Sequence, residues 1–338
     1  MVRFLKLSHA TLTRIAAGAA LLLAAFAIGW YGGRIQQVSA HDSASPIRIT
    51  DSEYPFISPL VGINLPSSQI FPELAKAQSD VQNIVSQAIK SGKATSIGLY
   101  FRIPGNAHSF GIGADQKFDP GSLIKVPIMI AYLKESETNP RVLTQKFLYS
   151  PSANTDSLPN ALPPQLPRGT YTVERLLEAM IIDSDNTAKD ILLDHMNIAD
   201  LNDVFDEMDI NFLKDPSGTI SPKTYIVFFS RLYGAGFLNR TSSNRALELL
   251  SKTTFTEGLV AGVPTSVVVA HKYGERGIYE DKMLTGAELH DCGLVYFPGT
   301  PYYLCVMTRG TEVNDLAEVI RSISSAVYND RASFAIKK

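Results

Sequence analysis

The chain has 338 residues, of which 45% are hydrophobic and 19% are charged, which is the composition of a folded protein rather than a disordered one. Its 31 Lys and Arg residues against 33 Asp and Glu leave a net charge of -2, without the basic excess of a nucleic-acid-binding protein. Two cysteines and six scattered histidines form no zinc-binding pattern. We therefore expect no nucleic-acid partner, no metal and no cofactor.

The N-terminal segment is predicted to be a transmembrane helix. Nineteen uncharged residues at 15–33 follow three basic residues, and a helix of this length spans about 28 Å, close to a hydrocarbon core. The preceding charges place the N-terminus in the cytoplasm. A cleaved secretory signal stays open as the alternative, because residues 38–40 resemble a cleavage site. The rest of the chain is then extracytoplasmic and membrane-anchored, or secreted after cleavage near Ala40.

Three regions follow along the chain. Residues 1–35 are a cytoplasmic stub and anchor, and residues 36–69, rich in Ser, Pro, Ile and Asp without periodicity, are a linker. Residues 70–338 form one catalytic domain, in which hydrophobic periodicity predicts the elements. In chain order they are a helix at 72–91, strands at 95–103 and 108–112, a helix at 122–136, a proline-rich excursion at 149–170, helices at 173–182, 187–196, 198–208, 222–233 and 242–251, strands at 267–273, 289–297 and 302–308, and a helix at 312–328.

The order of these elements predicts an α+β fold. Strands occur at both ends of the domain and helices lie between them. One antiparallel sheet completed by both ends of the domain, flanked by helices and beside a helical lobe, accommodates this order.

The first motif that carries chemistry is a serine and a lysine three residues apart, Ser122 and Lys125. This spacing places both side chains on one helical face, with the serine near the helix N-terminus and its free backbone N–H groups. A serine becomes a nucleophile when a base takes its proton, and a lysine serves when burial and a second cation lower its pKa. Taken alone, the pair is better explained as a helix cap and a surface lysine.

The second motif is Ser184-Asp185-Asn186, in a polar break between two predicted helices. A simple N-cap at Asp183 or Ser184 explains it when it is considered alone. In an active site, Ser184 would relay a proton and the amide of Asn186 would hold an acyl substrate.

The third motif is Lys272-Tyr273-Gly274, at the end of the strand predicted at 267–273. A lysine in this place is commonly exposed, but in a site it would attract a substrate carboxylate and help to lower the pKa of the first lysine. Gly274 would let a substrate lie against the strand edge. The backbone N–H of Glu275 would complete an oxyanion hole with that of the nucleophilic serine.

These motifs, in this order and setting, resemble the signature of class A β-lactamases and penicillin-binding proteins. The resemblance covers about residues 70–330 and implies a β-lactamase/transpeptidase-like fold. The residues at 291–297 are similar to the inner sheet strand of that family. The resemblance implies that Ser122 is the acylated nucleophile and that Lys125 is its general base. It also implies that Ser184 and Asn186 are the central-loop residues and that Lys272 binds a substrate carboxylate.

The sequence departs from the family pattern at two places, one of which concerns substrate turnover and the other substrate recognition. Class A β-lactamases carry a Glu-x-x-Leu-Asn loop after the second motif, whose glutamate activates the water that cleaves the acyl-enzyme. Between Asp190 and Pro222 the only glutamate is Glu207, without Leu-Asn after it and with the charged neighbours of an exposed helix residue. Tyr273 replaces the threonine or serine of the family, which puts penicillin recognition in doubt.

The two cysteines lie in the predicted sheet. Cys292 and Cys305 flank a Pro298-Gly299 turn almost symmetrically, so they would pair across the hairpin. A disulfide is permitted outside the membrane. Two buried thiols remain the alternative.

The expected protein is a membrane-anchored serine hydrolase that forms an acyl-enzyme at Ser122. Its expected partners are the membrane, through the N-terminal helix, and a small-molecule or peptidoglycan stem-peptide substrate, with β-lactam-like amides included. A true β-lactamase and a catalytically inactive binding or sensor domain are the alternatives. The intact motif residues argue against the inactive domain.

Overall fold

The computed structural model describes residues 54–57, 72–105, 108–151 and 166–335. The anchor predicted at 15–33 lies outside these ranges. Within them, no helix combines the length and the apolar character that a membrane span requires.

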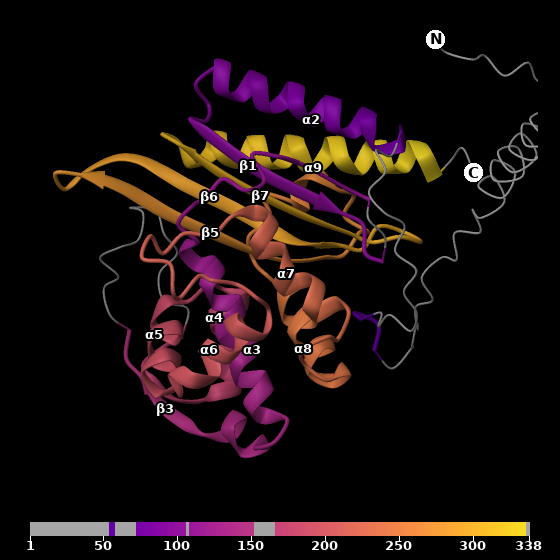
Figure 1. Cartoon of the computed structure of the whole chain (residues 1–338). Coiled ribbons are helices and arrows are strands. Elements are labelled where there is room, and N and C mark those ends of the chain that lie inside the picture. Colours follow the sequence, from indigo (N-terminus) through magenta and orange to yellow (C-terminus); the bar gives the residue numbers. More distant parts are fainter. Residues whose placement is uncertain (1–53, 58–71, 106–107, 152–165, 336–338) are drawn as a thin grey trace, which may run out of the picture. The chain divides into compact units, whose positions relative to one another are not determined.

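A five-stranded antiparallel sheet has the strand order β2-β1-β7-β6-β5, so both ends of the domain contribute to it (Figure 1). Leu99 of β1 lies opposite Val306 of β7, as expected from strands at both ends of the sequence. Among the described residues, the β5 strand pairs with β6 alone and forms one edge of the sheet. The strands are β1 (Ser96–Arg102), β2 (Ser109–Ile112), β5 (Val269–Glu280), β6 (Met283–Val295) and β7 (Tyr302–Gly310).

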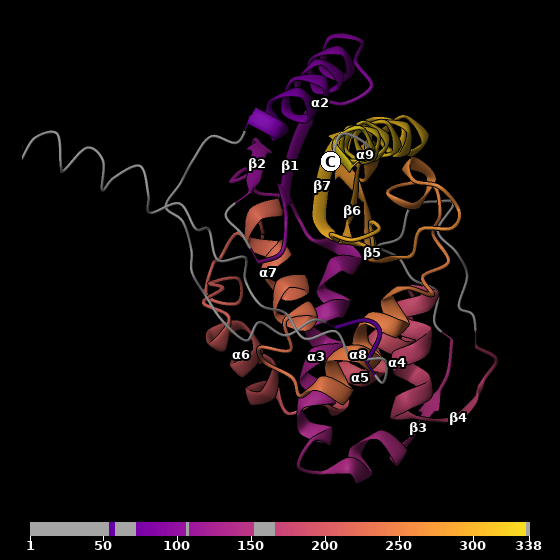
Figure 2. The ribbon, with the colours of Figure 1, turned by 90° about the vertical axis from the view of Figure 1, so that its right-hand side faces the viewer.

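Helices cover both faces of this sheet (Figures 1 and 2). On one face, α2 (Pro72–Lys90) and α9 (Val313–Ala335) enclose a core that includes Leu304. The adjacent residues Tyr303 and Cys305 point the other way, into a second core shared with the helical lobe. This alternation follows from the pleat of a strand, in which successive side chains point to opposite faces.

The helical lobe contains the segments between β2 and β5. Its helices follow the predicted apolar spacing closely, and several begin at a side-chain cap, such as Ser221 before α7. The lobe elements are the short 3-10 helices η1 (Gly121–Ile124) and η2 (Pro140–Thr144) and the α-helices α3 (Lys125–Ser136), α4 (Val173–Ile182), α5 (Asn186–His195), α6 (Ile198–Glu207), α7 (Pro222–Tyr233) and α8 (Arg240–Leu250), with η3 (Val260–Gly262) before β5.

Three local details differ from the sequence-based expectation. A two-stranded sheet of β3 (Lys146–Tyr149) and β4 (Gly169–Thr172) frames the proline-rich excursion, and strands of four residues are too short to show a clear alternation in the sequence. The β5–β6 hairpin extends through a glycine-rich and charged stretch at 274–288 that lacks a strand pattern. The helix expected from Ser122 starts as the 3-10 helix η1 and becomes α-helical at Lys125.

Part of the expected linker packs against the catalytic domain. Ile57 is buried in the lobe core, and the Phe56 N–H donates a hydrogen bond to Asn244 Oδ1 at 2.9 Å. The hydroxyl of Tyr296 donates to the Phe56 carbonyl at 2.8 Å. The stretch 54–57 therefore belongs to the domain, which differs from the linker expected over 36–69.

Candidate active site

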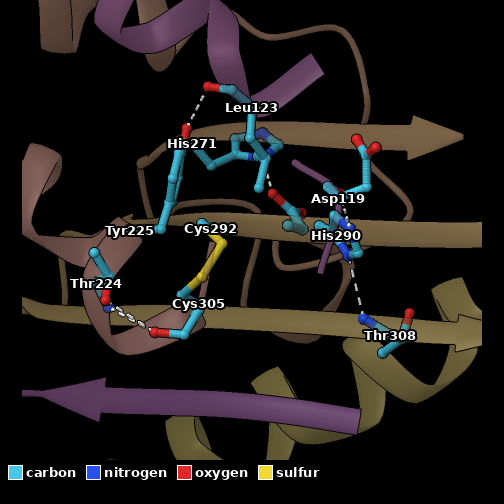
Figure 3. Close-up of a disulfide and its surroundings, with 11 residues drawn as sticks. Asp119, Leu123, Thr224, Tyr225, His271, His290, Cys292, Cys305 and Thr308 are labelled. Carbon is cyan, nitrogen blue, oxygen red and sulfur yellow. Dashed lines mark hydrogen bonds and ion pairs between the residues drawn. A yellow bond between two sulfur atoms is a disulfide. The ribbon is translucent and has the colours of Figure 1, made fainter. Parts of the chain in front are cut away.

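The candidate nucleophile lies on a tight turn ahead of α3. Gly121 has a φ of 50°, which a glycine adopts without steric cost, and its N–H donates to Asp119 Oδ1 at 3.0 Å. The next residues form η1, in which Ser122 precedes the buried Leu123. The hydroxyl of Tyr225 donates to the Leu123 carbonyl at 2.9 Å and so ties the turn to α7 (Figure 3). The turn thus holds Ser122 at the start of the helix.

Lys125 is fully buried beneath this serine, at 0% exposure. Its Nζ lies 2.9 Å from Ser122 Oγ, 2.6 Å from Asn186 Oδ1 and 2.5 Å from the Ser184 carbonyl oxygen. Burial, reinforced by the Lys272 cation, holds the pKa of Lys125 well below its ordinary value. An uncharged amine is therefore accessible, and its lone pair is within reach of the Ser122 hydroxyl proton.

The second motif forms the connection between α4 and α5. Ser184 has a φ of 56°, an uncommon conformation for a residue with a side chain, which costs of order 1 kcal/mol. Asp185 caps α5 by accepting from the Ala188 N–H at 2.8 Å, and its other oxygen accepts from the Tyr149 hydroxyl at 2.6 Å. This buried network holds the strained serine in place, with its Oγ 3.1 Å from Lys125 Nζ.

The third motif contributes a second buried lysine. The Nζ of Lys272 donates to Ser184 Oγ at 2.9 Å and to the Tyr273 carbonyl at 3.0 Å. The Tyr273 ring covers the same nitrogen, with 4.1 Å between Nζ and the ring centroid, and it stacks on Phe255 with 4.4 Å between centroids. Burial lowers the pKa of Lys272 to about 7. Ser184 therefore bridges the two lysines.

Gly274 brings the edge strand against the nucleophile turn. A Cβ on Gly274 would lie 2.6 Å from the Pro120 carbonyl oxygen and 3.1 Å from the Leu123 nitrogen. A larger residue would therefore push the edge strand and the nucleophile turn apart. Gly274 was expected to let a substrate lie against the strand edge, and in the structure the nucleophile turn approaches this position closely. The backbone of Glu275 also adjoins the turn, 3.0 Å from the position of a Gly121 Cβ.

Two side chains that support the site, His290 and Tyr149, were not predicted from the sequence. His290 Nδ1 accepts from the Thr308 N–H at 3.2 Å, so the proton lies on Nε2, which donates to the Asp119 carbonyl at 2.8 Å (Figure 3). Burial lowers the pKa of His290 to about 4, which keeps it neutral in this role. Together with Tyr149, it supports the site from outside the motifs, and only the tertiary structure brings these residues near the nucleophile.

The two cysteines form a disulfide across the centre of the sheet. Cys292 of β6 and Cys305 of β7 are directly opposite each other and are bonded, which decides between the two alternatives left by the sequence (Figure 3). On its other side, Cys292 is opposite Lys272 of β5. The disulfide thus joins β7 to the residue of β6 that pairs with the second buried lysine.

The connection at 208–221, where the class A pattern carries its catalytic glutamate, holds no glutamate here. Glu207 is exposed at the end of α6, and Asp215 is paired with Lys117. Phe212 and Ile220 of this connection instead line a small cavity of about 10 Å³ together with Ile124 of η1.

All eight motif residues named from the sequence therefore lie in one cluster around Ser122 and the start of α3. A serine hydroxyl next to a buried, readily deprotonated lysine can attack a carbonyl and form an ester with it. A second hydroxyl between two lysines can pass the proton to a leaving group. The geometry is that of a serine acyl-transfer enzyme.

Comparison with known proteins identifies the family. Residues 76–330 match the model of the beta-lactamase enzyme family, so the chain belongs to that family. Beta-lactamase VEB-1 of Pseudomonas aeruginosa is 25% identical to it over 283 residues, which cover 75% of this chain and 92% of that protein. The family, the α+β fold and the catalytic class predicted from the sequence are thereby confirmed, and the protein is a serine hydrolase.

Solved structures show the same relationship. The structure of PBP-A is 28% identical to the chain with a TM-score of 0.61, over 80% of this chain and 100% of that one. A mutant of PBP-A, solved as an acyl-enzyme complex with penicillin G, is 27% identical with a TM-score of 0.60 and covers 76% of this chain and 97% of its own. The similarity therefore extends to both β-lactamases and a penicillin-binding protein.

Proposed function

We propose that the protein is a membrane-anchored, extracytoplasmic peptidase of the penicillin-binding type, which acts on amide bonds of peptidoglycan stem peptides. The uncharged run at 15–33 supports the anchor. The disulfide between Cys292 and Cys305 supports an oxidising compartment outside the cytoplasm. The resemblance to PBP-A supports the penicillin-binding type.

The proposed reaction begins at Ser122. Uncharged Lys125 takes the proton of the hydroxyl, 2.9 Å away, while Oγ bonds to the substrate carbonyl carbon. The N–H groups of Ser122 and Glu275 stabilise the developing oxyanion. The carbon–nitrogen bond then breaks, and the proton passes from Lys125 through Ser184 Oγ to the leaving amine. The product is an ester of Ser122 and a free amine.

We choose a peptidase over a β-lactamase because the groups for acylation are present, whereas the glutamate for deacylation is not. The groups needed for acylation, Ser122, Lys125 and Ser184, are assembled within hydrogen-bonding distance of one another. The connection at 208–221 offers no glutamate to activate water for the second step. We therefore expect an acyl-enzyme that forms and then persists, unless an amine of a second stem peptide accepts the acyl group.

Labelling with a fluorescent penicillin tests this function. The full chain in detergent is incubated with the probe, then chased with unlabelled benzylpenicillin, in parallel with Ser122→Ala. Label that requires Ser122 and persists for hours supports the proposed peptidase. Absence of label at millimolar probe, together with failure of a broad serine-directed fluorophosphonate to react, would instead support an inactive binding domain.

A true β-lactamase is the second candidate, favoured by the similarity to Beta-lactamase VEB-1. In that case the same experiment shows rapid loss of label, and the unlabelled drug is hydrolysed with many turnovers per enzyme. The location is tested separately by fractionation. The full chain should remain in the membrane fraction after a high-salt wash, whereas a chain starting after residue 40 should be released.

A further inference from the structure

We propose that Glu275 is a specificity-determining residue, whose carboxylate disfavours substrates that carry a free carboxylate beside the scissile bond. The enzyme would then act on internal peptide bonds, or on esters with an uncharged leaving group, rather than on the last peptide bond of a chain. This inference rests on the proposed function, because it assumes acylation of Ser122.

The residue expected to bind a substrate carboxylate is occupied within the chain. Lys272 Nζ has three neighbours within the chain: Ser184 Oγ at 2.9 Å, the Tyr273 carbonyl at 3.0 Å and the Tyr273 ring, whose centroid is 4.1 Å away. The side chain is 0% exposed, and stacking on Phe255 holds the covering ring in place. Two of the three donors of an ammonium are thus used within the chain, and the Tyr273 ring covers the nitrogen, so a substrate carboxylate would reach Lys272 only after this ring moved.

The next charged side chain on the same strand is negative. Glu275 lies two residues after Tyr273, so both side chains leave the edge strand on the same side. Its carboxylate is half-buried and has no hydrogen-bond or ion-pair partner within the described parts of the chain. Its backbone abuts the nucleophile turn, with 3.5 Å between its nitrogen and the position of a Gly121 Cβ.

No basic side chain of the described residues forms a direct ion pair with Glu275. The adjacent Arg276 is paired with Asp119, on the other side of the turn. Burial raises the pKa of Glu275, and the cations of Lys272 and Lys125 oppose that change, which places this carboxylate in the electric field of the catalytic lysines. When it is ionised, Glu275 therefore places a carboxylate without an ion-pair partner among the described residues on the strand that adjoins the nucleophile turn.

A substrate carboxylate would meet this anion directly. In a penicillin, as in a C-terminal dipeptide, the carboxylate is borne on the carbon bonded to the scissile nitrogen, so it lies about 4 Å from the attacked carbonyl carbon. The attacked carbon must be at Ser122, next to Glu275. Two like charges in a half-buried site are poorly screened and repel each other.

A matched pair of probes isolates this charge. Benzylpenicillin and its methyl ester differ only in the carboxylate, and mass spectrometry of the intact protein gives the second-order rate constant of acylation for each. The wild type should prefer the ester. In Glu275→Gln the ratio of ester to acid rate constants should fall about tenfold, equivalent to about 1.4 kcal/mol.

Two further variants complete the test. Glu275→Asp keeps the charge and should retain most of the preference, and Glu280→Gln removes the same charge from the far end of β5 and should leave the ratio within twofold. Adducts on Ser122 with an unchanged ratio in Glu275→Gln overturn this inference alone. If neither probe acylates any of these proteins, the proposed function fails and the inference fails with it.

Discussion

The side-chain nitrogen of Lys125 lies 2.9 Å from the hydroxyl oxygen of Ser122, and the lysine is fully buried. The two residues are three apart in sequence, yet the nucleophile belongs to the 3-10 helix η1 and the lysine begins α3. Burial of the lysine lowers its pKa and so favours the uncharged amine. The short distance then allows this amine to accept the proton of the Ser122 hydroxyl. This relationship makes attack by the serine possible near neutral pH.

Replacing Lys125 by methionine should abolish rapid acylation while leaving the fold intact. The apolar chain fills the same buried space, but no base remains to take the Ser122 proton, and loss of such a base lowers rates by about 10²–10⁴-fold. Stopped-flow or mass-spectrometric acylation with a penicillin measures the effect. Lys134→Met on the exposed face of the same helix is the matched control and should acylate like the wild type. Acylation of Lys125→Met at the wild-type rate would exclude it as the base.

Removing the Tyr149 hydroxyl should loosen the strained serine loop. Tyr149→Phe takes one donor from the buried carboxylate of Asp185, which should lower the free energy of unfolding by about 1–3 kcal/mol. Acylation should slow several-fold even at temperatures where the variant is fully folded, because Ser184 loses its fixed position. Tyr171→Phe removes a hydroxyl whose one hydrogen bond within the described residues is to the Pro167 carbonyl, and it should change neither quantity appreciably. Equal effects of the two substitutions would contradict the assigned role.

The burial of Lys272 should make stability depend on pH. The pKa of this lysine is about 7 in the folded protein, against an ordinary value of 10.5 when it is exposed to water, so between these two values the unfolded chain binds more protons. The free energy of unfolding therefore rises with pH across this window, by up to about 1.4 kcal/mol per pH unit. Lys272→Met lacks this dependence.

Urea denaturation of both proteins at pH 7, 8 and 9 measures the difference. Subtracting the values for Lys272→Met removes the contributions of other titrating groups that the two proteins share. The difference should increase steadily in favour of the wild type as the pH rises. A constant difference over this range would show that Lys272 is not titrating near pH 7.

The disulfide between Cys292 and Cys305 should stabilise the sheet by about 2–3 kcal/mol, as expected for a bond that closes a short loop. Reduction should lower the thermal midpoint of the wild type. The double variant Cys292→Ala, Cys305→Ala should have the lower midpoint already and should not respond to the reductant. A wild-type midpoint that is insensitive to full reduction would show that the bond adds nothing to stability.

Much of the fold was accessible from sequence because its signals are local. The apolar spacing of α4, the capped start of α7 at Ser221 and the aromatic run of β7 each depend on residues within one element. The short strands β3 and β4 and the far part of the β5–β6 hairpin were missed, because pairing with a neighbouring strand, rather than their own composition, makes them strands.

For the site, the sequence by itself determined which groups carry the chemistry, since a nucleophile, a base and a relay must be specific residue types in the order that the three motifs present. It did not determine how those groups are partnered. Lys272 was expected to face a substrate, and the packing of Tyr273 and Phe255 encloses it instead. Tyr149 and His290 support the site from elements remote in sequence. Burial and hydrogen-bond partners arise from contacts between distant segments, so only the tertiary structure decides which charges are neutralised and which, such as that of Glu275, remain to meet the substrate.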